Sequence, residues 1–144
     1  NYELIASEND RVFDYENRIY RPFMTDQLLL KQLMTILFDN AIKYTEEDGK
    51  IGFVVHATDR HLYLTVTDNG IGISDADKKK IFDRFYRVDK ARTRQKGGFG
   101  LGLSLAKQIV DALRGTITVK DNKPRGTIFE VKIAIQSPSK RKNK

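Results

Sequence analysis

The sequence predicts an α+β fold, a two-layer sandwich in which a mixed sheet of about five strands carries about three helices on one face. Segments with apolar residues at every second position indicate strands, and segments in which they recur every three to four positions indicate amphipathic helices. These segments follow in the order strand, helix, strand, strand, helix, helix, strand, strand, so that hairpins stand between helices. A doubly wound α/β fold would instead alternate single strands with helices.

Each expected element has a local signal. Thr25 or Asp26 can cap the long helix and Ser74 the short one, because such side chains accept hydrogen bonds from the free N–H groups of a first helical turn. The polar stretch 89–98 has no periodicity and is expected to be a mobile loop. In chain order we expect an edge hairpin over 2–6 and 11–15, a helix from 26 to about 44, strands over 50–57 and 62–68, helices over 75–85 and 101–113, and strands over 116–120 and 127–135.

The composition is that of a single globular domain. The chain has 144 residues, of which 40% are hydrophobic and 31% charged, and this is enough to bury a core. The absence of cysteine excludes disulfides and thiolate metal sites. We expect one domain over residues 1–136, followed by a basic, disordered tail over 137–144.

The net charge of +7 is unevenly placed. Residues 78–96 hold nine lysines and arginines against two aspartates, and residues 140–144 hold four more basic side chains. A basic cluster of this kind is compatible with nucleic-acid binding. It is equally compatible with a bound polyphosphate, because the 78–96 segment lies beside a glycine-rich run.

That run, residues 96–104, places four glycines just before a helical apolar pattern. Glycine lets the backbone approach a ligand closely, and the N-terminus of a helix offers free N–H donors to phosphate. The chain has no Gly-x-x-x-x-Gly-Lys-Ser/Thr loop, and the run follows a polar loop rather than a strand. These two facts argue against a P-loop and against a dinucleotide-binding βαβ unit.

Three polar or aromatic residues share one face at the end of the long helix: Asn40, Lys43 and Tyr44. An amide oxygen can bind Mg²⁺, an ammonium group can contact phosphate, and an aromatic ring can border a base. The alternative is an ordinary helix end with a surface lysine and a half-buried tyrosine.

A second candidate segment, Asp68-Asn69-Gly70-Ile71-Gly72-Ile73, follows a strand directly. A carboxylate there can accept a hydrogen bond from the N6 amino group of adenine, whereas guanine presents an acceptor at the same place. The alternative is a common Asp-Asn-Gly turn.

Two further segments gain meaning only beside the others. In residues 81–87, Arg84 or Arg87 can turn toward a triphosphate, although an amphipathic helix end with exposed arginines explains the segment too. Gly126-Thr127 opens the last strand and is by itself only a turn followed by a strand.

Taken together and in this order, the segments resemble the catalytic ATP-binding domain of bacterial sensor histidine kinases, which have the Bergerat fold and share a superfamily with DNA gyrase. The resemblance covers about residues 1–136. The matching blocks are the N box 39–45, the G1 box 68–73, the F box 81–87, the G2 box 97–103 and the G3 element 126–129.

The resemblance implies a role for each matching residue. Asn40 would coordinate Mg²⁺, Lys43 would contact phosphate, and Tyr44 would border the adenine. Asn40, Lys43 and Arg87 would be the catalytic residues, and residues 74–100 would form a mobile lid over ATP. The remaining residues implied to bind the nucleotide are Asp68, Gly70, Gly72, Ile73, Arg84, Gly98, Phe99, Gly100, Leu101, Gly102, Leu103 and Thr127.

The resemblance also implies a partner that the chain lacks. In the family, the γ-phosphoryl group of Mg-ATP passes to a histidine on a separate helical hairpin, and a response regulator then takes it from that domain. We therefore expect poor activity from this domain alone and no nucleic-acid partner. The parent protein is expected to be a membrane-anchored bacterial homodimer with this domain on the cytoplasmic side.

Two positions depart from the family pattern. Ile36 stands four residues before Asn40, where relatives often carry asparagine or a catalytic glutamate, so we expect little ATP hydrolysis. Leu113-Arg114-Gly115 replaces the usual His-Gly-Gly and is expected to affect only a helix end. An anti-sigma serine kinase of the same superfamily and a basic nucleic-acid-binding module are the alternative functions.

Overall fold

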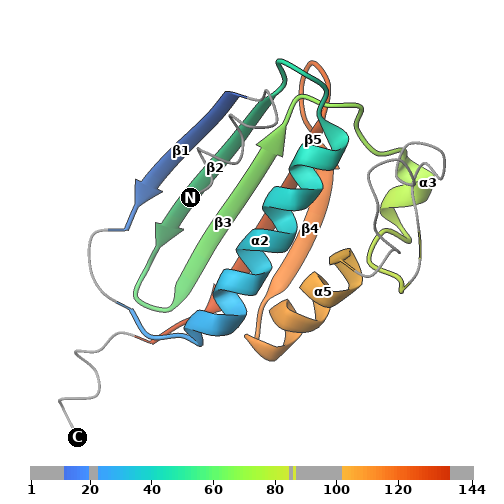
Figure 1. Cartoon of the computed structure of the whole chain (residues 1–144). Coiled ribbons are helices and arrows are strands. Elements are labelled where there is room, and N and C mark those ends of the chain that lie inside the picture. Colours follow the sequence, from blue (N-terminus) through green and yellow to red (C-terminus); the bar gives the residue numbers. More distant parts are fainter. Residues whose placement is uncertain (1–11, 20–22, 85, 87–101, 137–144) are drawn as a thin grey trace, which may run out of the picture.

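The sheet has five strands in the order β1-β2-β3-β5-β4 (Figure 1). The computed structural model describes residues 12–19, 23–84, 86 and 102–136. β1 pairs with β2 in parallel and the other neighbours are antiparallel, so the sheet is mixed, as predicted. The strands are β1 (Val12–Arg18), β2 (Lys50–Ala57), β3 (His61–Asp68), β4 (Thr116–Asp121) and β5 (Thr127–Ala134).

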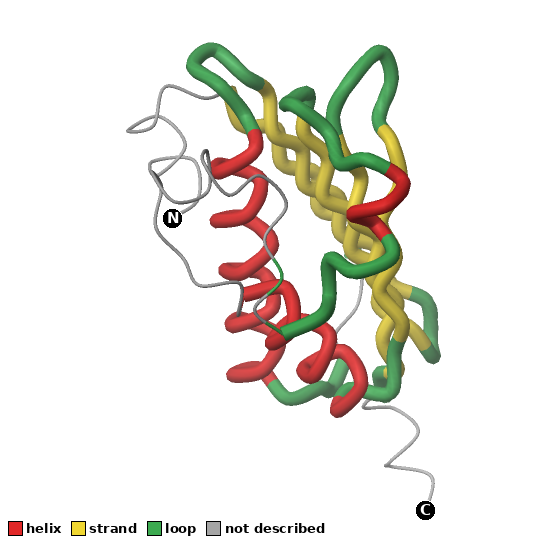
Figure 2. Tube along the Cα trace, turned by 90° about the vertical axis from the view of Figure 1, so that its right-hand side faces the viewer, coloured by secondary structure: helices red, strands yellow, loops and turns green. Residues whose placement is uncertain are grey.

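Two helices, α2 (Gln27–Tyr44) and α5 (Gly102–Ala112), lie side by side on one face of this sheet. Seen edge-on, they form one layer and the strands form the other (Figure 2). The short helix α3 (Asp75–Lys78) lies beyond the β4 side of the sheet. The predicted two-layer α+β sandwich with three helices is therefore confirmed.

The core lies between these layers and follows from the apolar periodicity. Leu33, Leu37 and Phe38 on α2 are fully buried against the sheet. From the strands, every second residue points into the same layer, among them Phe53, Leu64, Val66, Phe129, Val131 and Ile133. Among the described residues, no helix combines the length and the apolar character that a membrane span requires.

The start of α2 resolves the choice of cap. Asp26, not Thr25, is the N-cap, and its Oδ1 accepts a hydrogen bond of 3.0 Å from the N–H of Leu29. At the other end, the backbone N–H and hydroxyl of Thr45 both donate to the carbonyl of Ala41, at 3.1 and 2.8 Å. The helix therefore ends at Tyr44, as predicted, and its last turn is held in a fixed position.

One predicted element is wrong in length. The helix expected over 75–85 ends at Lys78 and is followed by separate turns, in which the N–H of Lys80 donates to Asp77 and that of Asp83 to Lys80. Each of these hydrogen bonds runs to the residue three positions earlier, as in a turn, and Ile81 within these turns is buried in the core. Tertiary packing of that side chain thus interrupts a segment whose local pattern favours a longer helix.

Several expectations fall on residues that the structure does not describe. Residues 2–6 of the expected edge hairpin, the loop 89–98 and the tail 137–144 are among them. The hairpin's second segment is present as β1, which extends to Arg18. Phe13 on this strand packs edge-on against Phe38 at 5.3 Å between ring centroids, and this contact ties β1 to the core.

The C-terminus of α5 explains the unusual Leu113-Arg114-Gly115 sequence. The N–H of Arg114 donates to the carbonyl of Asp111 and the N–H of Gly115 to that of Val110, which is the Schellman arrangement. Arg114 has a φ of 57°, a left-handed conformation that normally favours glycine. Gly115 has no room for a side chain, because a Cβ would lie 2.1 Å from the carbonyl oxygen of Lys132.

We predict that Arg114→Gly stabilises the domain by about 0.5–1 kcal/mol in urea unfolding. The left-handed conformation costs a non-glycine residue about 1–2 kcal/mol, and the extra chain entropy of glycine offsets about 0.5–1 kcal/mol of that gain. Gly115→Ala, at the next position, should instead destabilise the domain strongly. Equal or lower stability of Arg114→Gly would contradict this account of the helix end.

Candidate nucleotide-binding site

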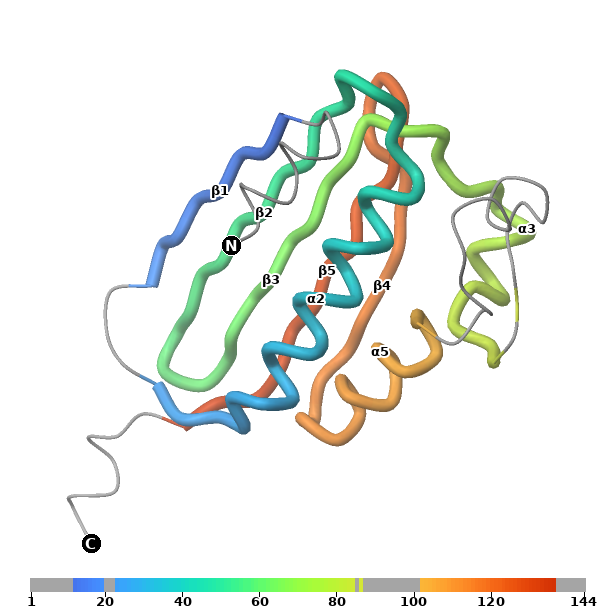
Figure 3. Tube along the Cα trace, in the orientation of Figure 1, coloured from blue at the N-terminus to red at the C-terminus, as the bar shows by residue number. Residues whose placement is uncertain are grey.

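Several of the predicted site residues belong to segments that meet at one end of the sandwich, where α2 and β3 end and β5 begins (Figure 3). The N–H of Ile71, just after β3, donates a 3.0 Å hydrogen bond to the carbonyl of Tyr44 at the end of α2. Asp68 at the end of β3 lies directly opposite Thr127, the first residue of β5. Segments far apart in the sequence therefore form one continuous backbone surface.

Glycine is required at two points of this surface. A Cβ on Gly70 would lie 1.8 Å from the carbonyl oxygen of Tyr44, and a Cβ on Gly126 would lie 1.9 Å from the carbonyl oxygen of Asp68. Gly126 also has a φ of 112°, which other residues rarely adopt. Both glycines thus allow neighbouring backbones to approach more closely than any side chain permits.

The carboxylate of Asp68 is the most unusual group at this end. Its residue is only 3% exposed, and this burial raises its pKa from 3.8 to about 6. Hydrogen bonds from the backbone N–H groups of Gly70 and Thr127 favour the charged form and lower the pKa in part. The bond from Gly70 to Oδ1 measures 2.9 Å. Such a shift is typical of carboxylates in functional sites.

Two other buried polar atoms have no partner within the described part of the chain: the amide nitrogen of Asn40 and the hydroxyl oxygen of Thr127. Buried polar groups in proteins are nearly always hydrogen-bonded. Asn40 lies one helical turn before Tyr44, and Thr127 lies beside Asp68. Both atoms are therefore suited to a ligand that enters this end of the domain.

The residues present also fit a magnesium ion delivered with a nucleotide. The described residues include no cluster of three or more His, Cys, Asp or Glu side chains that could hold a metal by itself. Mg²⁺ commonly keeps several waters and takes only one or two protein oxygens, with phosphate oxygens as further ligands. The side-chain oxygen of Asn40 can serve as such a protein ligand.

The other predicted residues are distributed as follows. Ile73 is buried, and Gly72 has a φ of 77°, with its Cβ position 3.5 Å from the carbonyl oxygen of Gly126. Arg84 is exposed in the turns after α3. Lys43 lies in the last turn of α2, and Gly102 and Leu103 are the first two residues of α5. Arg87, Gly98, Phe99, Gly100 and Leu101 lie outside the described residues.

Ile36 also lies near the site. A Cβ on Gly102, at the start of α5, would lie 3.7 Å from Cγ2 of Ile36. Ile36 stands one turn before Asn40 on α2 and is partly buried. An apolar side chain therefore occupies the position at which the resemblance leads us to expect asparagine or a catalytic glutamate.

Two residues of the β4–β5 loop contact the segment after β3, although they belong to none of the sequence motifs. The side-chain amide of Asn122 donates to the carbonyl of Asp68 at 2.8 Å, and Nε of Arg125 donates to the carbonyl of Gly70 at 2.8 Å. Their only sequence signal is that they stand just before Gly126-Thr127. Nothing in the local pattern of this loop predicts contacts across more than fifty residues.

A helix end whose asparagine amide nitrogen has no partner among the described residues, a buried aspartate after a strand and two close-approach glycines define the class of Bergerat-type nucleotide-binding domains. A family described as histidine kinase-, DNA gyrase B-, and HSP90-like ATPase matches residues 25–137, and the chain belongs to this family. Membership of an ATPase family indicates ATP as the nucleotide of the domain.

Individual relatives support the same assignment. The chain is 83% identical over 142 residues to the sensor protein CiaH of Streptococcus pneumoniae, a match that covers 99% of the chain and 32% of that protein. It is 45% identical over 101 residues to the histidine-protein kinase ArlS of Staphylococcus aureus, covering 70% of the chain and 22% of ArlS. The chain therefore spans about a third or less of the length of these relatives.

Solved structures agree with the sequence relatives. The nucleotide-free catalytic domain of the histidine kinase ThkA superposes with a TM-score of 0.79 at 27% identity, covering 94% of the chain and 88% of that domain. ThkA bound to the response regulator protein TrrA matches with a TM-score of 0.74 at 26% identity, covering 97% of the chain and 38% of ThkA. The predicted resemblance to sensor kinase catalytic domains is confirmed, and neither the serine-kinase nor the nucleic-acid alternative is favoured.

The raised pKa of Asp68 predicts a pH-dependent stability difference between the wild type and Asp68→Asn. Between about pH 4 and pH 6 the unfolded carboxyl is ionised while the folded one still holds its proton, so the wild type loses stability as the pH rises. The variant has no such loss. Its free energy of unfolding relative to the wild type should therefore rise by about 2–3 kcal/mol from pH 4 to pH 7.

Urea unfolding of both proteins at several pH values measures this difference. A difference that does not change with pH would mean that Asp68 has the same pKa in the folded and unfolded states.

Proposed function

We propose that this domain binds Mg-ATP at the end of the sandwich formed by α2, β3 and β5 and donates the γ-phosphoryl group to a histidine of a separate helical hairpin domain. The observation that carries the proposal is the buried carboxylate of Asp68, held by backbone groups at the floor of the site. The match to sensor kinases over nearly the whole chain supports the same reaction.

Adenine recognition follows from the charge of Asp68. Its carboxylate only accepts hydrogen bonds, and the N6 group of adenine donates them. Guanine presents the O6 acceptor at the corresponding position, and two acceptors repel each other. Gly70, Gly72 and Ile73 line the base, and the ring of Tyr44 borders it. A buried carboxylate therefore selects ATP over GTP.

The phosphates are bound from the helix ends. Asn40 would hold Mg²⁺ through its side-chain oxygen, and the bound ion would supply positive charge beside the β- and γ-phosphates. Lys43 contacts phosphate from the same face of α2, and we expect Arg84 and Arg87 to contact phosphate as well. We expect the backbone of residues 98–103 to supply further donors to phosphate, whereas the hydroxyl of Thr127, beside Asp68, is placed to contact the base.

The transfer itself needs little chemistry from this domain. A nitrogen of the incoming imidazole attacks the γ-phosphorus in line, the bond to the β–γ bridging oxygen breaks, and ADP leaves with the electron pair. Much of the rate comes from positioning the two reactants. Ile36 cannot activate a water molecule, so bound ATP is kept for the histidine instead of being hydrolysed.

The longer relatives suggest the context of this reaction. We infer that the parent protein is a membrane-anchored homodimer. In it, this domain lies in the cytoplasm and the phosphoacceptor hairpin is another part of the longer polypeptide. ThkA has been crystallised with a response regulator protein, and a regulator of this kind is the expected acceptor after the histidine.

The proposal predicts that Asn40→Ala lowers transfer from radiolabelled ATP to the parent protein's hairpin domain by about 100-fold or more, because positioning and phosphate-charge neutralisation are both lost. Gln32→Ala, an exposed position on the same helix, is the control and should leave the rate unchanged. The label should be labile in acid, as phosphohistidine is. An acid-stable label would indicate a serine kinase, and equal rates for both variants would contradict the role of Asn40.

A further inference from the structure

The end of β4 at Asp121 and the β4–β5 loop that follows, residues 122–126, contact two separate parts of the site region. The loop touches the base loop, which we define as residues 68–72, and Asp121 touches helix α3. We propose that Asn122 and Arg125 are positioning residues that hold the base loop in the shape that recognises adenine. This inference rests on the proposed binding of ATP and extends it to residues outside the motifs of the sequence.

The two side chains bind carbonyl groups at the end of β3 and just beyond it. β3 ends at Asp68, so the carbonyls of Asp68 and Gly70 lie at or beyond the last ladder pair. Asn122 donates to the first carbonyl and Arg125 to the second, each at 2.8 Å. The base loop is thus held by the side chains of the β4–β5 loop and, separately, by the hydrogen bond from the N–H of Ile71 to the carbonyl of Tyr44.

The orientation of Asn122 is determined by its own loop. Its Oδ1 accepts a 2.9 Å hydrogen bond from the N–H of Lys123, and this leaves the amino group to face the carbonyl of Asp68. The N–H of Asn122 donates to the carbonyl of Gly126 at 3.0 Å and closes the loop on itself. A preformed loop therefore presents the donor, so that little side-chain entropy is lost when the bond forms.

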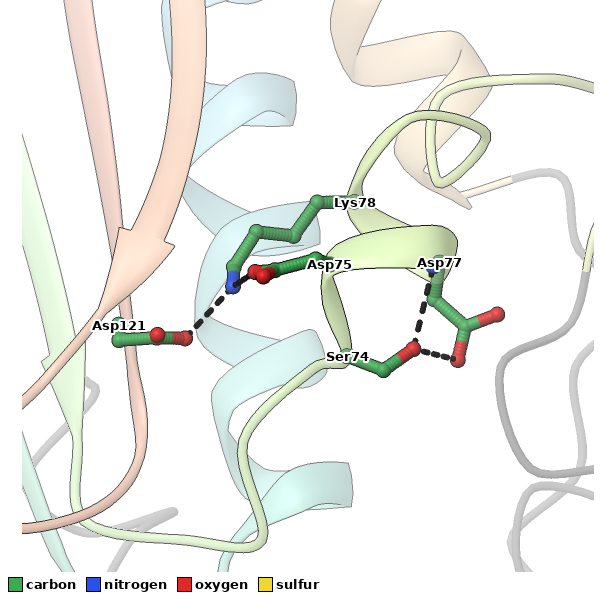
Figure 4. Close-up of polar contacts among 5 residues, drawn as sticks. All are labelled: Ser74, Asp75, Asp77, Lys78 and Asp121. Atoms are coloured by element: carbon green, nitrogen blue, oxygen red, sulfur yellow. Dashed lines mark hydrogen bonds and ion pairs between the residues drawn. The ribbon is translucent and has the colours of Figure 1, made fainter.

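The last residue of β4, just before this loop, also contacts α3. Nζ of Lys78 lies 2.7 Å from Asp121 and 2.8 Å from Asp75, and the Lys78 side chain is only 16% exposed (Figure 4). On α3 itself, Ser74 caps the first turn through the N–H of Asp77. The end of β4 is thus joined by an ion pair to α3, the first helix after the base loop.

Removing the donor of Arg125 should displace Gly70, both its carbonyl and its N–H, and the N–H is the group that donates to the carboxylate of Asp68. Arg125→Met and Lys123→Met form a matched pair, because each removes one positive charge from an exposed side chain of the same loop. Only Arg125→Met also removes a hydrogen bond to the base loop. Titration calorimetry with Mg-ATP, and competition with Mg-GTP, should be done on both variants and the wild type.

We expect Arg125→Met to bind ATP about 5- to 30-fold more weakly than Lys123→Met, which is the effect of losing one such hydrogen bond. GTP affinity should be equal in the two variants, so that the preference for ATP falls. Asn122→Asp is a second test: it keeps an acceptor for Lys123 but loses the donor to Asp68, and the ATP preference should fall again. Unfolding free energies identify any variant that is simply less folded.

Three outcomes would overturn the inference. Equal ATP affinity of the matched pair would mean that Arg125 does not position the loop. A parallel loss of ATP and GTP affinity would place Arg125 on the phosphates instead. An unchanged ATP preference in Asn122→Asp would remove Asn122 from the set. A wild type that binds no ATP would instead contradict the proposed function itself.

Discussion

The nucleotide-binding end depends on the close approach of three backbones around Gly70 and Gly126. The carbonyls of Tyr44 and Asp68 occupy the space where the side chains of these glycines would lie. Because no side chain separates the segments, their hydrogen-bonding groups meet directly, as the bond from Ile71 to Tyr44 demonstrates. The floor of the site is therefore made of backbone, and its shape is fixed before any ligand arrives.

This floor carries a buried carboxylate, which is costly for stability. Burial raises the pKa of Asp68 to about 6, so near neutral pH the domain pays for holding the group charged. The amide nitrogen of Asn40 and the hydroxyl of Thr127, which lack partners in the part of the chain that the structure describes, add to the cost. Three destabilising features at one end of a well-packed domain are the pattern expected of a binding site, where stability is given up for function.

Much of this arrangement could be predicted from the sequence, because strong periodicity fixes an element locally. The alternation of Phe129, Val131 and Ile133 defined β5, and the boundaries of β2 and α2 agree closely with expectation. The sequence motifs also predict that Tyr44 and Gly70 belong to one site, and the folded chain brings their backbones into close approach.

The rest depends on contacts that no local pattern contains. The short length of α3 follows from the burial of Ile81. The parallel pairing of β1 with β2 is a contact between strands far apart in the sequence, which no local pattern specifies. Asn122 and Arg125 act on residues 54 and 55 positions away. Loop residues with polar side chains occur throughout any sequence, so only the folded geometry shows which of them support a site.

The most direct test of this account is the affinity of the wild type and of Asp68→Asn for Mg-ATP and Mg-GTP. We expect the wild type to bind ATP in preference to GTP, and the variant to bind ATP about 10- to 150-fold more weakly, because a hydrogen bond to a charged group is worth about 1.5–3 kcal/mol. Unchanged ATP affinity in the variant, or equal affinity of the wild type for both nucleotides, would contradict the assignment of Asp68 as the group that recognises adenine.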